Sequence, residues 1–306
     1  MHASSYASNL GKRTDAEIFG LWDDNLVRAK EFAGQWGLKV VEDLETLLQG
    51  SDAVVICSEN MKHADLIERA ARAGKPIICE KPLAVNSEQT AKIRRVLAET
   101  GIKLMTAFPC PFSPTFQRLA QRINAGEIGK VLAINATNRG RCPFGWFTDP
   151  ALSGGGAMID HVVHVTDLLR RLLGEDPSRV TAQIGNNMYG EDWEDTAHLT
   201  IDFPTGVFAT LDSSWSRHKN YKTWGDVTLR VTGEKGVIEA DLFGQGLSLT
   251  TDHAWHLGTG SDLDGLMIDE FVNAVREGRQ PIVTAEDGLK ASAVAIMGYE
   301  SARAQK

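Results

Sequence analysis

Short apolar runs alternate with helical segments through the first third of the chain, and this alternation constrains the fold most strongly. The runs at 53–57, 76–80 and 102–108 are rich in β-branched residues. The segments between them have helical periodicity and end at Gly74 and Gly101, as helices closed by a left-handed glycine do. Strands that alternate with helices predict a parallel sheet with right-handed crossovers.

Beyond residue 108 the alternation gives way to strand-like runs separated by turns. One long helical segment at 158–173 precedes most of these runs, and two helical segments close the chain. We therefore expect an α/β protein of two domains: a Rossmann-like, doubly wound parallel sheet at 1–108, then an α+β domain with a mostly antiparallel open sheet at 109–286. The closing helix at 287–304 is expected to pack back on the first domain.

Composition places the chain among ordinary globular proteins. Of its 306 residues, 42% are hydrophobic and 24% are charged, which excludes a disordered or fibrous chain. The net charge of -8 comes without a strong basic patch, no apolar run is long enough to cross a bilayer, and the first residues lack a signal-peptide pattern. The four cysteines form no C-x-x-C pair, which predicts reduced thiols. We expect a cytoplasmic protein without nucleic-acid or membrane partners.

A lysine follows one predicted strand in the sequence Glu80-Lys81-Pro82. Open α/β sheets bind ligands at the carboxyl ends of their strands, so these side chains are candidates for a ligand site. A surface lysine beside a turn proline is the alternative, and these residues alone leave both interpretations open.

Small polar groups follow the neighbouring strand, in the loop that carries Ser58, Glu59, Asn60 and His63. At a strand end these groups could contact the phosphates or the ribose of a nucleotide. A loop that simply caps the next helix is the plainer alternative.

Asp23 follows a further predicted buried strand, at 16–22. An acid at this place in a dinucleotide fold accepts hydrogen bonds from the adenosine ribose hydroxyls. No arginine stands beside it in the sequence, so we expect it to repel a 2′-phosphate and to favour NAD, with NADP the less favoured cofactor. A helix cap formed by Asp-Asp-Asn at 23–25 is compatible with this role.

The sequence GGGAMIDHVVH at 154–164 places glycines before a helix that carries acid and imidazole groups. Asp160 and His164 are four residues apart, so they share a face, and a carboxylate beside an imidazole suits a general base. The alternative is a solvated polar stripe, which Asp167 and Arg171 would continue. The three glycines favour function, because a solvated helix start does not need them and they permit close approach to a ligand.

A metal site is a further alternative for the same helix. Asp160, His161 and His164 could be ligands, but the two histidines lack the H-E-x-x-H spacing and no cysteine pair supports them. We therefore expect no metal.

Together these segments resemble the Gfo/Idh/MocA family, the glucose-fructose oxidoreductase and inositol dehydrogenase group. The resemblance covers nearly the whole chain and rests on SENMKH at 58–63, AGKPIICEKPLA at 73–84 and GGGAMIDHVVHVTDLL at 154–169, with further family-like segments at 193–203 and 286–302. It implies an NAD-binding Rossmann domain, hydride transfer at a carbon of a small sugar or polyol, and a homodimer or homotetramer formed through the second-domain sheet.

The resemblance also implies roles for individual residues. Lys81 would lie beside the nicotinamide and the reacting hydroxyl, His164 would be the general base, and Asp160 would orient His164 or bind an adjacent hydroxyl. The implied cofactor contacts are Asp23, Ser58, Glu59, Asn60, His63, Glu80, Lys81 and Pro82. The implied substrate contacts are Asn138, Arg139, Trp146, His161 and Asp167. We expect Lys81 and His164 to converge across one crevice between the domains.

Two departures from the family pattern matter. Family members begin with a strand and G-x-G-x-x-G, whereas residues 1–6 resemble the helix that follows them, so we expect the strand upstream of Met1 or a protein that does not bind NAD normally. Residues 108–112, FPCPF, stand where many members have an arginine, which affects the substrate. Alternatives to a dehydrogenase are a non-catalytic ligand sensor on the same fold and an NAD-dependent glycosidase.

Overall fold

A short parallel sheet carries the first lobe of the computed structural model, which describes residues 2–221, 223–250 and 254–305. Its strands are β1 (Val54–Ile56), β2 (Ile77–Cys79) and β3 (Leu104–Thr106), in that spatial order. Within β2, Ile77 and Cys79 join one hydrophobic cluster and Ile78 joins another, because successive side chains of a strand point to opposite faces. The predicted parallel α/β arrangement is confirmed.

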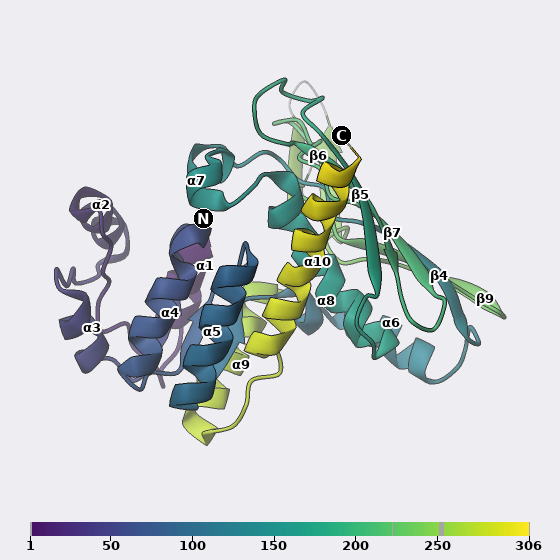
Figure 1. The fold of residues 1–306 in the computed structure, drawn as a ribbon. Coiled ribbons are helices and arrows are strands. Elements are labelled where there is room, and N and C mark those ends of the chain that lie inside the picture. Colours follow the sequence, from purple (N-terminus) through teal and green to yellow (C-terminus); the bar gives the residue numbers. More distant parts are fainter. Residues whose placement is uncertain (1, 222, 251–253, 306) are drawn as a thin grey trace.

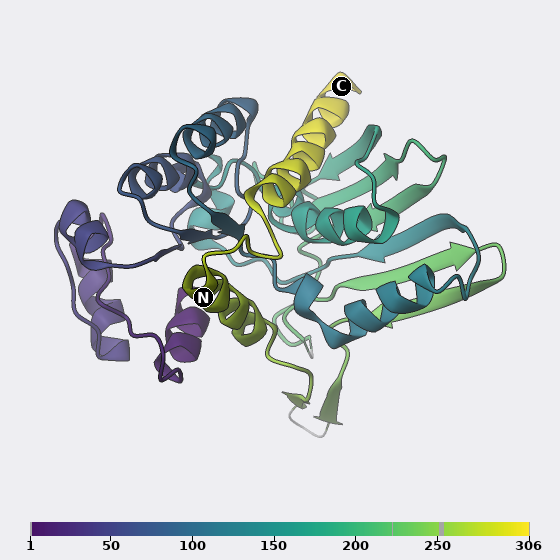
Figure 2. The same cartoon turned by 90° about the horizontal axis from the view of Figure 1, so that it is seen from below.

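Helices cover both faces of this parallel sheet. On one face lie α4 (His63–Arg72) and α5 (Ser87–Thr100), which begins after Asn86, whose side chain caps the first turn. On the other face lie α1 (His2–Gly11) and α9 (Leu263–Glu277), which pack against each other (Figure 2). The sheet is therefore covered on both sides, as a parallel sheet requires.

The predicted buried strand at 16–22 is wrong. The structure has only a single parallel bridge there, between Leu21 and Val40, with α2 (Leu26–Trp36) between them and α3 (Leu44–Gly50) after them. Within the described ranges no other strand pairs with Leu21, and Phe19 is 40% exposed. A parallel strand is buried only when its edges are paired and its faces are covered.

A six-stranded mixed sheet carries the second lobe (Figure 1). Its spatial order is β5-β6-β7-β4-β8-β9, and only β4 and β7 run parallel. The strands are β4 (Val131–Thr137), β5 (Arg179–Gly185), β6 (Thr196–Asp202), β7 (Phe208–Asp212), β8 (Thr228–Gly233) and β9 (Gly236–Asp241). The expected mostly antiparallel sheet is confirmed.

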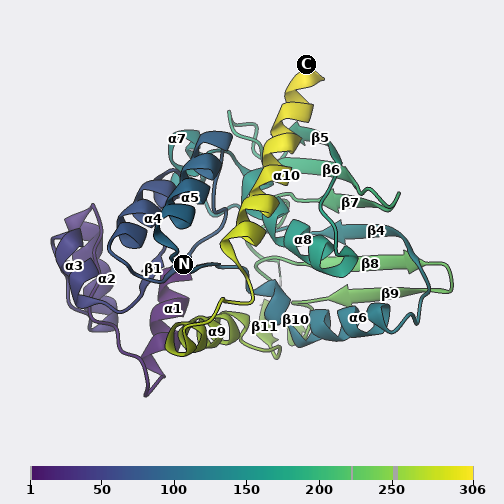
Figure 3. The same cartoon turned by 60° about the horizontal axis from the view of Figure 1, so that its bottom comes forward.

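Helices lie on one face of the second-lobe sheet and leave the other face open (Figure 3). The covering helices are α6 (Pro114–Asn124), α8 (Ala157–Leu173) and α10 (Ala285–Ala304). Beneath them Ile134 and Leu211 are fully buried, whereas their neighbours in sequence are exposed or half-buried. A hairpin of β10 (Gly246–Thr250) and β11 (Ala254–Gly258) forms a separate two-stranded sheet.

The last two helices connect the lobes. Although α9 falls within 109–286, it packs on the first lobe, where Asp269 pairs with Arg13 of the segment after α1. α10 touches the first lobe at its start, where Thr106 donates to the carbonyl of Thr284, and then lies along α8 and β5. In the described part of the chain no helix is long and apolar enough to cross a membrane.

Candidate active site

Lys81 extends from the end of β2 to the second lobe. Its Nζ lies 2.5 Å from Oδ1 of Asp160 on α8, and it also donates to the Asp160 carbonyl at 3.2 Å. The two side chains are only 8% and 10% exposed. The sheet edge and the second-lobe helix therefore meet in a buried ion pair between the lobes. The expected convergence of Lys81 with His164 across one crevice stays a prediction.

The carboxylate of Asp160 is held from three directions. Besides Lys81, the indole Nε1 of Trp215 donates to Oδ2 at 3.1 Å, and Nε2 of His161 lies 3.3 Å from the same oxygen. Burial opposes the charged form, but the charges of Lys81 and His161 and the hydrogen bonds outweigh it and lower the pKa of Asp160. Because both oxygens are engaged in this way, Asp160 does not make the contact with His164 that was expected to orient the imidazole.

His164 lies one helical turn beyond Asp160. Its ring centre is 5.6 Å from that of Phe108 in the first lobe, and its Nδ1 is buried without a partner among the described side chains. Burial, and then the positive charge of Lys81, lower the pKa of His164 well below its usual value. The imidazole is therefore neutral at pH 7 and able to accept a proton.

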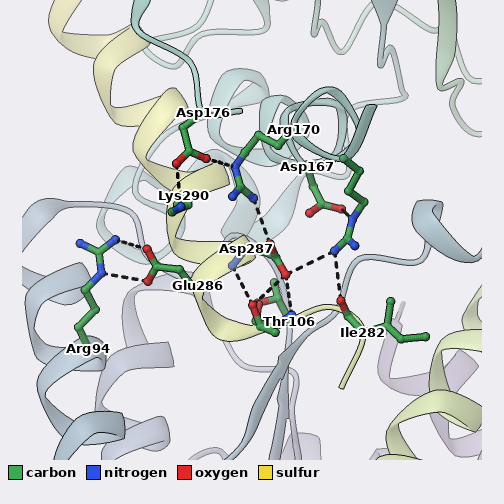
Figure 4. Close-up of polar contacts among 11 residues, drawn as sticks. Arg94, Thr106, Asp167, Arg170, Asp176, Ile282, Glu286, Asp287 and Lys290 are labelled. Atoms are coloured by element: carbon green, nitrogen blue, oxygen red, sulfur yellow. Dashed lines mark hydrogen bonds and ion pairs between the residues drawn. The ribbon is translucent and has the colours of Figure 1, made fainter. Parts of the chain in front are cut away.

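The polar stripe on α8 is buried against the first lobe, so the alternative of a solvated helix face is wrong. Asp167 is fully buried, with Oδ2 accepting a 2.8 Å hydrogen bond from Arg171 and Oδ1 unpaired within the described ranges. Burial raises the pKa of Asp167. Arg171 also donates to Asp287 in the first turn of α10 and to the carbonyl of Ile282, which precedes that helix. Figure 4 shows Asp167, Asp287 and Ile282 in this region. These contacts favour a structural role, and the substrate contact of Asp167 stays a prediction.

The glycines before α8 are required by protein neighbours. A Cβ on Gly154 would collide with Val85, one on Gly155 with Tyr299, and one on Gly156 with the Glu194 backbone. Gly154 also has a φ of 81°, which favours glycine. The expectation that these glycines admit a ligand is therefore wrong, because protein atoms take that space.

The loop after β1 is tied to protein groups. Nδ1 of His63 lies 2.9 Å from the Pro82 carbonyl and Nε2 lies 3.2 Å from the Ser58 carbonyl, so the imidazole joins the ends of β1 and β2. Asn60 donates to the Ser153 carbonyl at 2.8 Å, across the lobes. The side chains of His63 and Asn60 are thus engaged, while Ser58 makes only a 3.3 Å contact with the carbonyl of Glu59.

An ionic rim lies beside this loop. Its members are Asp23, Asp24, Arg28, Glu59 and Lys62. Arg28 donates to both oxygens of Asp23, at 2.7 and 2.8 Å. The argument that Asp23 has no arginine beside it is therefore wrong, because the first turn of α2 turns Arg28 back onto it. Three carboxylates still face two cations, so the rim remains negative and suits ribose hydroxyls better than a 2′-phosphate.

Glu80 is held by the N-terminal helix. The hydroxyl of Tyr6 donates to Oε1, the backbone N–H of Lys81 lies 3.2 Å from Oε2, and Nδ1 of His2 is 3.9 Å from Oε1. The start of α1 therefore lies at the carboxyl edge of the sheet, the edge at which Rossmann folds bind dinucleotides. This placement, with Ser58 and the acidic rim at the same edge, fits an NAD site.

The other predicted substrate contacts lie against protein groups. Asn138 and Arg139 are engaged with Asp226, which also accepts a 2.6 Å hydrogen bond from Arg217. The imidazole of His161 touches Asp160 and also packs against Gly140, where a Cβ atom would collide with the ring. Trp146 stacks on Phe147 with ring centres 3.8 Å apart.

Within the described ranges no three His, Cys, Asp or Glu side chains gather as metal ligands.

Sequence reasoning missed Trp215, Tyr6 and Asp226. Nothing in the local sequence marks Trp215, because its partner Asp160 is 55 residues away. Nothing in the local sequence marks Tyr6, because its partner Glu80 is 74 residues away.

Comparison with known proteins identifies the family of this chain. Residues 1–108 match the family described as "Oxidoreductase family, NAD-binding Rossmann fold", and residues 116–239 match the "GFO/IDH/MocA C-terminal domain". Inositol 2-dehydrogenase of Rhizobium meliloti is 30% identical over 98% of this chain and 92% of its own length. The scyllo-inositol 2-dehydrogenase (NAD(+)) of Bacillus subtilis is 30% identical over 90% of this chain and 83% of its own.

Solved structures have the same fold. GenD2 from gentamicin A biosynthesis, in complex with NAD, has a TM-score of 0.90 at 23% identity and covers 100% of this chain and 92% of its own. Myo-inositol 2-dehydrogenase from Lactobacillus plantarum has a TM-score of 0.84 at 22% identity, covering 99% and 94%. The resemblance seen in the sequence is confirmed: the chain belongs to the Gfo/Idh/MocA family of oxidoreductases, with an NAD-binding Rossmann fold as its first domain.

Proposed function

We propose that this protein is an NAD-dependent dehydrogenase that transfers hydride between nicotinamide and a hydroxyl-bearing carbon of a sugar or polyol. Lys81, Asp160 and His164 are its catalytic residues. The observation that carries the proposal is the buried Lys81–Asp160 pair between the lobes, one helical turn from a neutral imidazole. The names of two relatives, both inositol 2-dehydrogenases, support a ring polyol as the substrate class.

His164 takes the proton of the reacting hydroxyl. Its imidazole is neutral at pH 7 because burial and Lys81 disfavour the charged form, so it is ready to act as a base. Nδ1 is enclosed, which leaves Nε2 to face the substrate. In the reverse direction the imidazolium returns the proton to the oxygen.

Lys81 stabilises the negative charge that develops on the substrate oxygen as its proton leaves. An ammonium group in a buried site is effective because little water screens it. Asp160 fixes the position of Lys81, and Trp215 fixes that of Asp160. When bound, NAD supplies the nicotinamide carbon that accepts the hydride.

The carboxyl edge of the parallel sheet is the proposed cofactor site. Ser58 and Glu80 lie at the ends of β1 and β2, and Asp23 lies at the acidic rim where ribose hydroxyls would bind. His63, Asn60 and Glu59 support this edge through their protein contacts. Lys81 and Pro82, which follow Glu80, lie toward the nicotinamide end.

A homodimer or homotetramer formed through the open face of the second-lobe sheet is also proposed. Large apolar side chains remain exposed on these strands, among them Leu132, Phe208 and Val237. Contiguous exposed apolar surface is typical of interfaces. The four cysteines are free, which supports a reducing compartment such as the cytoplasm.

His164→Ala tests the catalytic assignment in the NAD-loaded protein. We expect the variant to lower kcat by on the order of 10³ while NADH binding stays unchanged, because it removes only the base. His218→Ala, at an exposed histidine in the segment after β7, is the matched control and should keep full activity. NADH should appear in equal amounts with the oxidised product.

Unchanged turnover in His164→Ala would remove the assigned base. A protein that binds NADH but oxidises and reduces none of a broad panel of sugars and polyols would favour a ligand sensor. Cleaved glycoside without net NADH would indicate a glycosidase.

A further inference from the structure

A chain of aromatic rings runs from the catalytic carboxylate to the protein surface, and we call it the aromatic wall. Trp215 donates to Asp160, and its ring centre lies 5.6 Å from that of Trp193. Trp193 is 5.4 Å from Tyr189 and 6.5 Å from Phe144, and these two outer rings are 5.5 Å apart, edge to face. The four rings thus form one continuous chain of contacts.

The two ends of the aromatic wall differ in exposure. Trp215 is fully buried and packs with Ala157 at the start of α8, so its role is structural as well as polar. Phe144 is 52% exposed and Tyr189 is 37% exposed. Packing within the lobe explains the inner rings, but it does not explain a pair of adjoining large rings left in water, which is typical of a binding surface.

The two outer rings are held in place by the backbone, which is strained at Phe144 and hydrogen-bonded at Tyr189. Phe144 has φ 53° and ψ -164°, a backbone conformation that is close to glycine-only. Tyr189 is fixed differently: the buried carboxylate of Asp195 accepts the backbone N–H groups of Met188 and Tyr189, at 2.9 and 2.8 Å. A bulky ring kept in a strained position beside a second, anchored ring indicates a surface prepared for a ligand.

The aromatic wall stands beside the junction of the lobes. Phe144 leads directly into the 3₁₀ turn Gly145–Thr148 and then α7 (Pro150–Ser153). α7 reaches the first lobe, where Asn60 donates to the Ser153 carbonyl (Figure 1). Trp215, which donates to Asp160, and Trp193 connect the outer rings to the Lys81–Asp160 pair, so a ligand held at that pair lies at the inner end of the aromatic wall.

We propose that Phe144 and Tyr189 form a subsite for a second ring, so that the substrate is a sugar or ring polyol that carries an attached ring. This inference rests on the proposed function. The reacting sugar binds at Lys81 and Asp160, and the attached ring stacks its C–H or π face on the outer rings of the wall. Glu191 and Asp192, in the loop after Tyr189, disfavour an anionic ring. The attached ring is therefore a neutral sugar or an aryl aglycone.

Ring preference is measured directly by calorimetric binding to the NADH-loaded protein. The probes are phenyl and methyl β-glycosides of glucose, galactose, mannose and xylose, with cellobiose as the two-sugar case. We expect at least one phenyl glycoside to bind about tenfold more tightly than its methyl partner, as ring stacking in a prepared site permits. Cellobiose that shares this gain identifies a sugar subsite, and a gain limited to phenyl glycosides identifies an aryl subsite.

Two variants of Phe144 separate the effect of losing the ring from the effect of the strained backbone. Phe144→Gly and Phe144→Ala both remove the ring, and both should abolish the tenfold preference while leaving the methyl glycoside affinity unchanged. Glycine accepts the positive φ, so Phe144→Gly should unfold at a higher temperature than Phe144→Ala. Tyr189→Phe keeps the ring and should keep the preference. Phe243→Ala, at an exposed ring after β9, is the matched control and should also keep it.

Equal affinity for phenyl and methyl glycosides in every pair would overturn the subsite, as would a preference that survives Phe144→Gly. A change of oligomeric state in Phe144→Ala would identify the wall as an interface between subunits and would also overturn it. If no sugar yields NADH but the ring preference is present, the proposed function fails and the subsite stands.

Discussion

Two buried aspartates lie on the same face of α8, and their surroundings differ. Asp160 has both oxygens bonded, and its main partner, Lys81, comes from the other lobe, so its pKa is lowered despite burial. Asp167, two turns on, has one oxygen bonded, and its partner Arg171 belongs to the same helix, so burial raises its pKa. One helix face thus provides a charged group for the proposed chemistry at one end and an anchor between helices at the other.

The Asp160 end of the stripe should give the largest effects. Lys81→Met leaves Asp160 buried without its cation, so we expect the free energy of unfolding to fall by about 3–5 kcal/mol. We expect kcat to fall by on the order of 10³, because the charge opposite the developing alkoxide is lost. Urea unfolding and steady-state kinetics measure the two effects.

The double variant Lys81→Met/Asp160→Leu separates stability from chemistry. Replacing both partners by apolar groups removes the unpaired charge, so most of the stability should return while activity does not. Recovery of activity in the double variant would contradict the assigned role of the pair.

Acid should lower the free energy of unfolding through the buried histidines on and near the Asp160 end of α8. The pKa values of His63, His161 and His164 are lowered, chiefly by burial, so the unfolded chain binds protons that the folded chain does not. Their stabilising contribution is complete above the unfolded pKa near 6.5 and is lost as pH falls toward the lowered values, by up to about 1.4 kcal/mol per pH unit for each histidine.

The contribution of His164 to the pH dependence of stability is obtained by comparing wild type with His164→Asn. Buried carboxyl groups with a raised pKa, such as Asp167, act in the opposite sense, so the slope of wild type alone is a mixture. Urea unfolding of wild type and His164→Asn between pH 7 and pH 5 should give slopes that differ by up to one proton, with the difference growing as pH falls below the unfolded pKa. Parallel slopes would mean that His164 titrates in the folded protein as it does when unfolded.

Substitution at the Asp167 end should lower the free energy of unfolding more than it lowers activity. Asp167→Asn keeps the shape and loses only the charged hydrogen bond to Arg171, so we expect a loss of about 1–3 kcal/mol and little change in kcat or KM. Asp160→Asn, the matched change, should lower kcat by at least on the order of 10². A tenfold rise in KM for Asp167→Asn would instead place this carboxylate on the substrate.

The smallest effect is expected where a single neutral hydrogen bond joins the lobes. Asn60→Ala removes the donor to the Ser153 carbonyl and should cost about 0.5–1.5 kcal/mol with kcat nearly unchanged. Asn124→Ala, at an exposed position near the end of α6, is the control and should be neutral. Thermal unfolding of both variants measures the difference, and an equal loss in both would remove the link.

Features that depend on a few neighbouring residues, such as helix ends and helix faces, could be predicted from the sequence. Gly74, Gly101 and Gly174 follow helices and have φ between 66° and 74°, as their positions in the sequence indicate. The rule that strand ends carry functional groups directed attention to Lys81, which follows β2 and pairs with Asp160, and helical spacing placed Asp160 and His164 on one face. These predictions needed no knowledge of distant residues.

Distant partners decided what the sequence could not predict. Lys81, not His164, took the carboxylate of Asp160, because the partner came from 79 residues away. The glycines at 154–156 could be recognised as necessary, but their neighbours Val85, Tyr299 and Glu194 come from three separate segments. Arg28 reached Asp23 only because of the backbone geometry at the start of α2.

The indole of Trp215 gives the molecule a built-in optical probe. It is fully buried and donates its only N–H to Asp160. Indole emission depends on what that N–H bonds and on how much water is near, so any event that moves the carboxylate should change the spectrum of this one ring. With the other six tryptophans replaced by phenylalanine, occupancy of the crevice could be followed in real time without a label.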